Sequence, residues 1–152
     1  MLVRGLVVSV DDTGTAQTVT VKTHDGMIYR DIEVWMPFGF ASNPPIDGAA
    51  VVLMAIGGDV GHYLALPVSA ASRRFGNQAN GEAVMYAFDG TRVHCRAGGK
   101  VEIWGATEVT VHSKDVAITA SGTITLNAGQ IEIDGSLHVT GPINATGTIH
   151  GA

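Results

Sequence analysis

The chain has 152 residues, 45% of them hydrophobic and only 15% charged, with a formal net charge of −5. This acidic balance argues against a nucleic-acid-binding protein, which normally needs a basic patch. The only cysteine, Cys95, excludes an intrachain disulfide. No apolar run approaches the roughly 20 residues that span a bilayer, and the amino terminus has too short an apolar run for a signal peptide. We therefore expect a soluble protein made in a reducing cytoplasm.

Residues 1–71 are expected to form a compact all-β domain without a helix. Apolar and β-branched residues alternate in several short segments, which Gly, Asp and Thr turns and one longer loop with three prolines separate. The expected strands are 2–10, 17–23, 28–36, 50–56 and 62–69. About five strands in some 70 residues fit a small closed barrel such as an OB-fold. Four basic side chains, Arg4, Lys22, His24 and Arg30, are scattered along this region and are outnumbered by acidic ones, so a nucleic-acid groove is not expected.

Residues 72–82, "SRRFGNQANGE", are polar and carry turn formers, which is typical of a connector. The segments 83–88 and 91–97 flank an Asp-Gly turn and are expected to form a second hairpin. The third region of the chain, 83–152, begins with this hairpin.

From Val101 onward, apolar residues come in pairs with one polar residue between them, and the pairs recur every six to eight residues. Gly, Ser, Asn, Asp and Thr fill the intervals. Alternation of this kind predicts very short strands that each turn one side toward a core. The predicted core residues are Val101, Ile103, Val109, Val111, Val116, Ile118, Ile124, Leu126, Ile131, Ile133, Leu137, Val139, Ile143 and Ile149.

Two architectures provide a core for such strands. A single-chain β-solenoid would need about 22 residues for each coil, so residues 101–152 would make only about two and a half coils, fewer than such folds generally require. In a homotrimer, three chains wind around one axis and the inward side chains meet there. Aliphatic side chains suit such a narrow prism, and we favour the trimer. The predicted fold is all-β, with an OB-fold barrel followed by a triple-stranded β-helix.

The order of these elements resembles a known family. A barrel that ends in "GGDVGHYLALPVSAASRRFG" is followed by "GEAVMYAFDGTRVHC" and then by the valine and isoleucine repeat. This order is similar to the central spike, or baseplate assembly protein V, of contractile-tailed phages, above all in the phage Mu group. The resemblance covers essentially the whole chain and rests on the order of elements rather than on one motif.

The resemblance implies a homotrimer in the virion, at the centre of the tail baseplate, made in the host cytoplasm. The OB-fold domain, 1–71, would attach to tail hub proteins, and the shaft, 83–152, would pierce the host outer membrane when the sheath contracts. It implies a mechanical protein and no enzyme. A spike of a tailocin or a toxin-injection system would be indistinguishable at this level.

The carboxy-terminal tip departs from the family pattern. Many members end in a His-x-His pair, of which three copies bind an iron ion, whereas this chain ends "GTIHGA" with His150 alone. We therefore expect no cofactor and keep His150 as a weak metal candidate. A blunt tip, a small capping protein and a truncated sequence remain alternatives.

Other reactive residues have simpler interpretations. His94, His112 and His138 each follow an inward apolar residue and are expected to face solvent, whereas Cys95 shares the inward side with Val93. We interpret Cys95 as a small buried hydrophobic residue.

Two further functions stay open at this point. Glu132 and Asp134 project from one strand side, which admits a carbohydrate-degrading tailspike. A single-chain scaffold that polymerises end to end is the other alternative. Arg73 and Arg74 are expected in a solvated loop, with a hub contact as the alternative.

Overall fold

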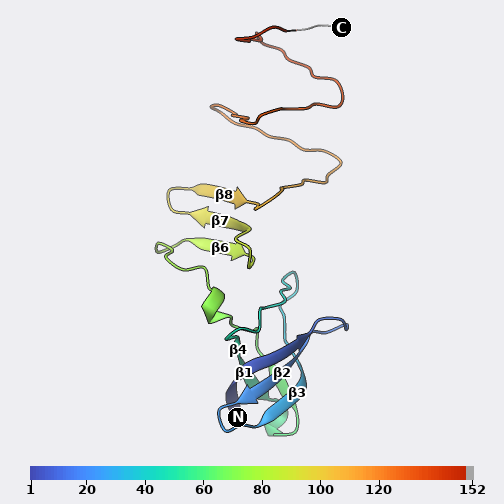
Figure 1. Ribbon diagram of the computed structural model, residues 1–152, viewed down its shortest axis with the longest axis vertical. Helices are drawn as coiled ribbons and strands as arrows, with labels where there is room; N and C mark the ends of the chain where they lie inside the picture. The colour runs from blue at the N-terminus through green and yellow to red at the C-terminus, as the bar shows by residue number, and fades with distance from the viewer. Residues whose placement is uncertain (150–152) are drawn as a thin grey trace. The chain divides into compact units, whose positions relative to one another are not determined.

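The computed structural model describes residues 1–149 and divides the chain into two units, 1–110 and 111–152. The first unit contains all the strands, and within residues 1–149 helix is limited to two 3₁₀ turns, Ile56–Gly58 and Ala71–Arg73. The prediction of an all-β chain is confirmed (Figure 1). No helix among residues 1–149 has the length and apolar character needed to cross a membrane. The strands are β1 (Leu2–Asp11), β2 (Thr18–Thr23), β3 (Ile28–Glu33), β4 (Ala50–Ala55), β5 (Tyr63–Ala65), β6 (Ala83–Tyr86), β7 (Arg92–Arg96) and β8 (Lys100–Trp104).

The first five strands form one antiparallel sheet with the order β3-β2-β1-β4-β5. The two edges of this sheet approach each other just after β3. Val34 forms a parallel bridge with Ala65 of β5, and the N–H of Trp35 donates to the Ala65 carbonyl over 2.8 Å. The sheet is therefore barrel-like and nearly closed, which satisfies most of the backbone groups that an open edge would expose.

The core of the barrel follows from the alternation of apolar and polar residues. Val19, Val21 and Leu53 are fully buried, and Val7, Val51 and other aliphatic side chains surround them. The polar residues between them on β2 face outward or are partly covered. Full burial of a Val or Leu side chain contributes roughly 1.5–3 kcal/mol to the free energy of unfolding, so this part of the chain contains a core of its own.

Gly5 permits the close packing of β1 on β2. A Cβ atom built on Gly5 would lie 2.4 Å from Cγ1 of Val21 and 2.9 Å from the carbonyl oxygen of Lys22. These distances are too short for any side chain at position 5, so the strand pair depends on glycine there.

A second, smaller sheet follows residues 72–82. Its three antiparallel strands have the order β6-β7-β8. The hairpin expected at 83–97 is present, and the first apolar pair of the repeat, Val101 and Ile103, lies in β8, which pairs with β7.

After β8 the chain has no regular secondary structure within the described residues. From 105 to 149 no strand is assigned, and every residue is exposed. Figure 1 draws this segment (orange to red) without a strand arrow. The strands predicted for the later apolar pairs are therefore not formed within the single chain.

Replacement of Gly5 by alanine should lower the free energy of unfolding by about 1–3 kcal/mol, because the added methyl group overpacks the β1–β2 contact. Thermal or denaturant unfolding measures the change. The matched control is Gly76→Ala, where the nearest atom to the new Cβ would be Nη1 of Arg74 at 3.9 Å. Equal stability of the two variants would contradict this account of the strand pair.

Candidate functional site

The two faces of the β6–β8 sheet differ sharply. On one face, Val84, His94 and Glu102 lie opposite one another across the three strands. The next row on this face is Tyr86, Arg92 and Trp104. Because directly paired residues of neighbouring strands project to the same side, these rows form one continuous surface.

The segment between the two sheets covers this face. The ring of Phe75 lies 5.8 Å from that of Tyr86 and 5.3 Å from that of His94, measured between centroids. The Arg92 guanidinium lies over the rings of both Phe75 and Trp104, at 5.6 and 4.7 Å. The connector is therefore packed on the sheet through aromatic and cation–π contacts.

Glu82 adds a polar clamp at the end of the connector. Its Oε1 accepts the N–H of Ala97 over 3.0 Å, its Oε2 accepts the N–H of Ala79 over 3.1 Å, and Nε2 of His94 lies 3.5 Å from Oε2. The hydrogen bonds from Ala97 and Ala79, with the nearby His94, hold the pKa of Glu82 below its ordinary value.

The expectation that His94 faces solvent is wrong. Only 7% of His94 is exposed, because Phe75 and Glu82 lie against it. Alternation placed His94 on the opposite face from Val93, as the strand pairing requires, but it gave no sign that the connector folds across that face.

The other face of the sheet is apolar and largely exposed within the described chain. Met85, Val93 and Ile103 form one row, and Ala83, Cys95 and Val101 form the next. Met85, Val101 and Ile103 are each more than 60% exposed, and Cys95 is also exposed. Cys95 therefore shares a face with Val93, as the sequence predicted, but the interpretation of Cys95 as a buried residue is wrong for the single chain, because nothing in the described chain covers its side chain. We call this surface the apolar face.

The repeat in the second unit presents the same kind of side chains. All the predicted core residues from Val109 to Ile149 are exposed, to between 44% and 70%. We call these residues, with Val101 and Ile103, the apolar stripe. So many exposed aliphatic residues in one segment are unusual for an ordinary protein surface. Their assignment to a trimer core stays a prediction.

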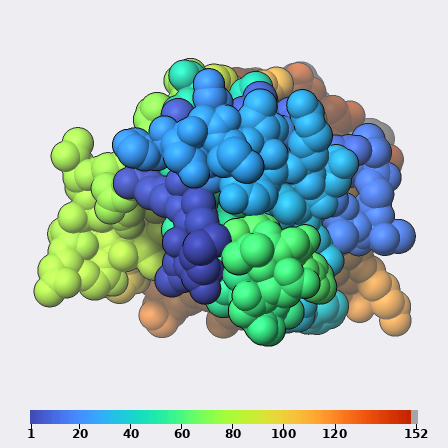
Figure 2. All heavy atoms as spheres, turned by 90° about the horizontal axis from the view of Figure 1, so that it is seen from below, coloured from blue at the N-terminus to red at the C-terminus, as the bar shows by residue number. Residues whose placement is uncertain are grey.

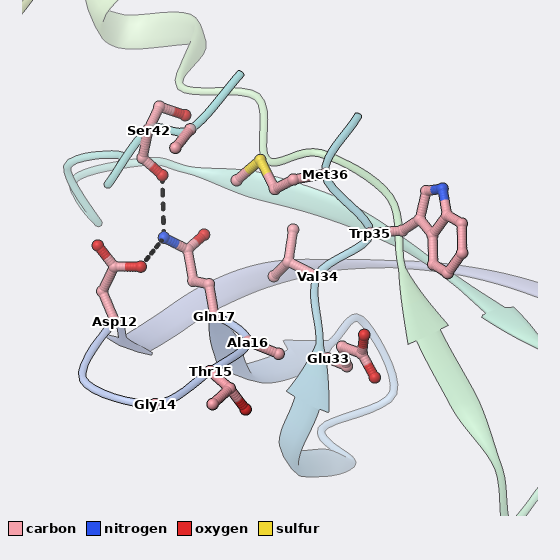
Figure 3. Close-up of a pocket in the computed structure, with 11 residues that line it drawn as sticks. Asp12, Gly14, Thr15, Ala16, Gln17, Glu33, Val34, Trp35, Met36 and Ser42 are labelled. Atoms are coloured by element: carbon pink, nitrogen blue, oxygen red, sulfur yellow. Dashed lines mark hydrogen bonds between the residues drawn. The ribbon is translucent and has the colours of Figure 1, made fainter. Parts of the chain in front are cut away.

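The barrel surface carries an acidic pocket, lined by Asp12, Gln17, Glu33, Trp35 and Ser42 among others (Figure 3). Gln17 is 9% exposed, and its Nε2 donates to Oδ1 of Asp12 and to the Ser42 carbonyl, each over 2.9 Å. Its Oε1 is buried and accepts no hydrogen bond.

A second hollow of the barrel is basic. Arg4, Leu6, Lys22 and His24 line it, with Gly5 and Thr23 between them. Leu6 and Lys22 are directly paired across β1 and β2. Three of the four basic residues that are scattered in the sequence of this domain therefore gather at one place.

The remaining candidates are not brought together. His112, His138, Glu132 and Asp134 are all exposed, and His150 lies outside the described residues. No group of three or more metal-ligating side chains forms within residues 1–149. Arg73 lies 3.5 Å from Asp47 and over the Phe88 ring at 4.5 Å, so its guanidinium has intrachain contacts.

Residues 4–72 match the family model described as Bacteriophage Mu Gp45, N-terminal. Comparison with curated proteins gave no match. The family match confirms the resemblance to the phage Mu group for the barrel. It suggests a structural role in a phage baseplate or spike and hence a place in the virion.

The clamp at Glu82 predicts a pH-dependent contribution to stability. Because the pKa of Glu82 is lowered in the folded protein, its stabilising effect is fully present above the ordinary glutamate value of about 4.5 and is lost as the pH falls through the lower folded value. Glu82→Gln should therefore lower the thermal unfolding midpoint at pH 7, and the difference from the wild type should shrink as the pH falls below the ordinary glutamate value of about 4.5. A constant difference between the two proteins across that range would contradict the clamp.

Proposed function

We propose that three copies of this chain form the central spike of a contractile phage tail, with a triple-stranded β-helical shaft that pierces the host outer membrane. One observation carries the proposal. The apolar stripe extends from Val101 to Ile149 and is exposed throughout. A structural phage role for the barrel, suggested by the family match at residues 4–72, gives this stripe its context.

The energetics favour burial of the stripe between copies. Each Val, Ile or Leu side chain removed from water stabilises the assembly by roughly 1.5–3 kcal/mol. Left in a monomer, the stripe would be a severe aggregation hazard. The apolar face of the β6–β8 sheet would join the same core, because Val101 and Ile103 belong to both surfaces.

The backbone of the second unit leads to the same arrangement. Between residues 105 and 149 the N–H and C=O groups form no strand pairs within the chain. Three chains wound around one axis would pair these groups between subunits, and each layer of the shaft would receive a strand from every chain. A single-chain coil would bury the stripe within one copy, whereas none of its residues from Val109 to Ile149 is buried here.

The barrel would form the platform of the spike. Its strand order, with the parallel contact between the end of β3 and β5, supports an OB-fold. In the proposed particle this domain sits on the tail hub at the baseplate, and the shaft points toward the host.

The proposed mechanism is mechanical rather than enzymatic. Contraction of the sheath supplies the force, and the shaft transmits it without buckling, because aliphatic side chains pack its axis and strands of three chains interlock around it. The function of the stripe residues is then the stiffness that they give to the rod. A small apex protein or a metal at His150 would modify the tip without changing this mechanism.

A polar substitution in the stripe tests the shaft. Ile124→Asn should place three unpaired amides at the axis, each costing about 1–3 kcal/mol in addition to the lost apolar contacts. We expect a large fall in the thermal stability of the trimer and a loss of the three-fold species in native mass spectrometry. The matched control is Thr125→Asn, since the neighbouring position projects to the opposite side of the strand. A clean trimer of unchanged stability with Ile124→Asn would contradict the packing.

Piercing itself is tested with assembled tail particles triggered to contract against dye-loaded vesicles made from outer-membrane lipids. We expect dye release with wild-type particles and with Thr125→Asn particles, and strongly reduced release with Ile124→Asn particles at equal sheath contraction. Release that is independent of the shaft variant would remove the piercing role while leaving the trimer intact.

A further inference from the structure

We propose that the barrels of the trimer also form a closed ring, in which the acidic pocket of each copy receives the basic hollow of the next copy. The inference rests on the proposed trimer and assigns its second interface. The partner it names is a second copy of this chain.

The acidic pocket has the groups needed to bind a cationic side chain. The Asp12 carboxylate is held in place by Nε2 of Gln17 at 2.9 Å, and Glu33 lies across the pocket from it. The amide of Gln17 is nine-tenths buried, and its Oε1 is an acceptor without a donor. Figure 3 shows this oxygen turned toward Val34 and Met36. An incoming ammonium or guanidinium group supplies donors to two carboxylates, and displacement of the flexible Met36 side chain opens Oε1 to it.

The basic hollow presents the complementary chemistry. Arg4 and Lys22 flank the exposed Leu6 on the outer surface of β1 and β2, and His24 extends the same surface. Asp25, the nearby acidic group, already accepts hydrogen bonds from the hydroxyl of Thr23 and the N–H of Met27. Two long cationic side chains are therefore available around an apolar centre.

The two surfaces are separate regions of the same barrel, as a three-fold ring requires. Rotation about a three-fold axis brings different surfaces of neighbouring copies together, so each copy must carry two complementary patches. Leu6 is opposite Lys22, and Asp12 lies six residues further along the chain, roughly 20 Å away at the usual strand rise. Figure 2 shows the loop around residues 12–16 (medium blue) projecting on one side of the barrel, away from the first residues of β1 (dark blue).

Each surface also carries an exposed apolar side chain. Leu6 is 58% exposed in the hollow, and Trp35, which points away from Gln17 beside the pocket, is 61% exposed. An apolar centre with charged groups around it is the usual composition of a protein interface. Because both halves of this interface occur on the same domain, a second copy of the chain fits them without any other partner.

The direct test is zero-length carbodiimide coupling of the full-length trimer, which joins a carboxylate to an amine only where they touch. We expect a link between Lys22 and Asp12 or Glu33, identified by peptide mass spectrometry. In trimers mixed from ¹⁴N- and ¹⁵N-labelled chains, the link should join a light peptide to a heavy one, which proves that it connects different copies.

Charge reversal tests the same contact by stability. Asp12→Lys with Glu33→Lys, and separately Arg4→Glu with Lys22→Glu, should each lower the melting temperature of the trimer, more at low than at high salt. The four changes together should restore it. A net-charge control joins the acidic-pocket reversal to Arg30→Glu and Lys114→Glu, and this variant should stay destabilised.

The outcomes separate the two proposals. A wild-type chain that is not a trimer ends both. A trimer that gives no link between Lys22 and either carboxylate, and whose stability does not change with either reversal, contradicts the ring alone and leaves the proposed trimer intact. The ring is also contradicted if the net-charge control restores the melting temperature as fully as the four changes do. The effect would then be one of total charge.

Discussion

The dominant constraint on this molecule is that the apolar stripe is exposed along its whole length within the described chain. Between residues 105 and 149 no strand is assigned, so no sheet of the same chain lies over these aliphatic groups. Water contact along such a stripe is unfavourable in proportion to its area. The amino-terminal barrel buries its apolar side chains in its own core, whereas those of the repeat stay exposed within a single chain.

The β6–β8 sheet stands between these two regimes. One of its faces is covered by the connector, through the Phe75 ring and the Glu82 carboxylate. The other, with Met85 and Ile103, is left uncovered. Along the sequence, the burial of apolar side chains within one chain therefore decreases. The barrel has its own core, the β6–β8 sheet is covered on one face, and the apolar stripe is exposed.

Local alternation was enough to predict the strands of the barrel, the hairpin at 83–97 and the side of β7 on which Cys95 lies. It failed where a distant segment decides the environment. His94 is buried because residues 75 and 82 fold over it, and Arg4 joins Lys22 only because the register places residue 6 opposite residue 22. Neither fact has a signature in a window of a few residues, since both depend on pairing between segments.

The repeat has a further physical consequence. Pairs of aliphatic residues that recur every six to eight positions specify burial strongly, but they specify register weakly, because a chain displaced by one repeat still places apolar groups at the axis. In the proposed trimer, elements with unique contacts would therefore have to align the three chains. The barrel and the β6–β8 sheet have specific contacts of this kind, such as the close β1–β2 approach at Gly5 and the packing of Phe75 on His94. In the proposed trimer, the folded amino-terminal part would therefore set the register of the three chains, and the repeat would add stiffness without specifying register.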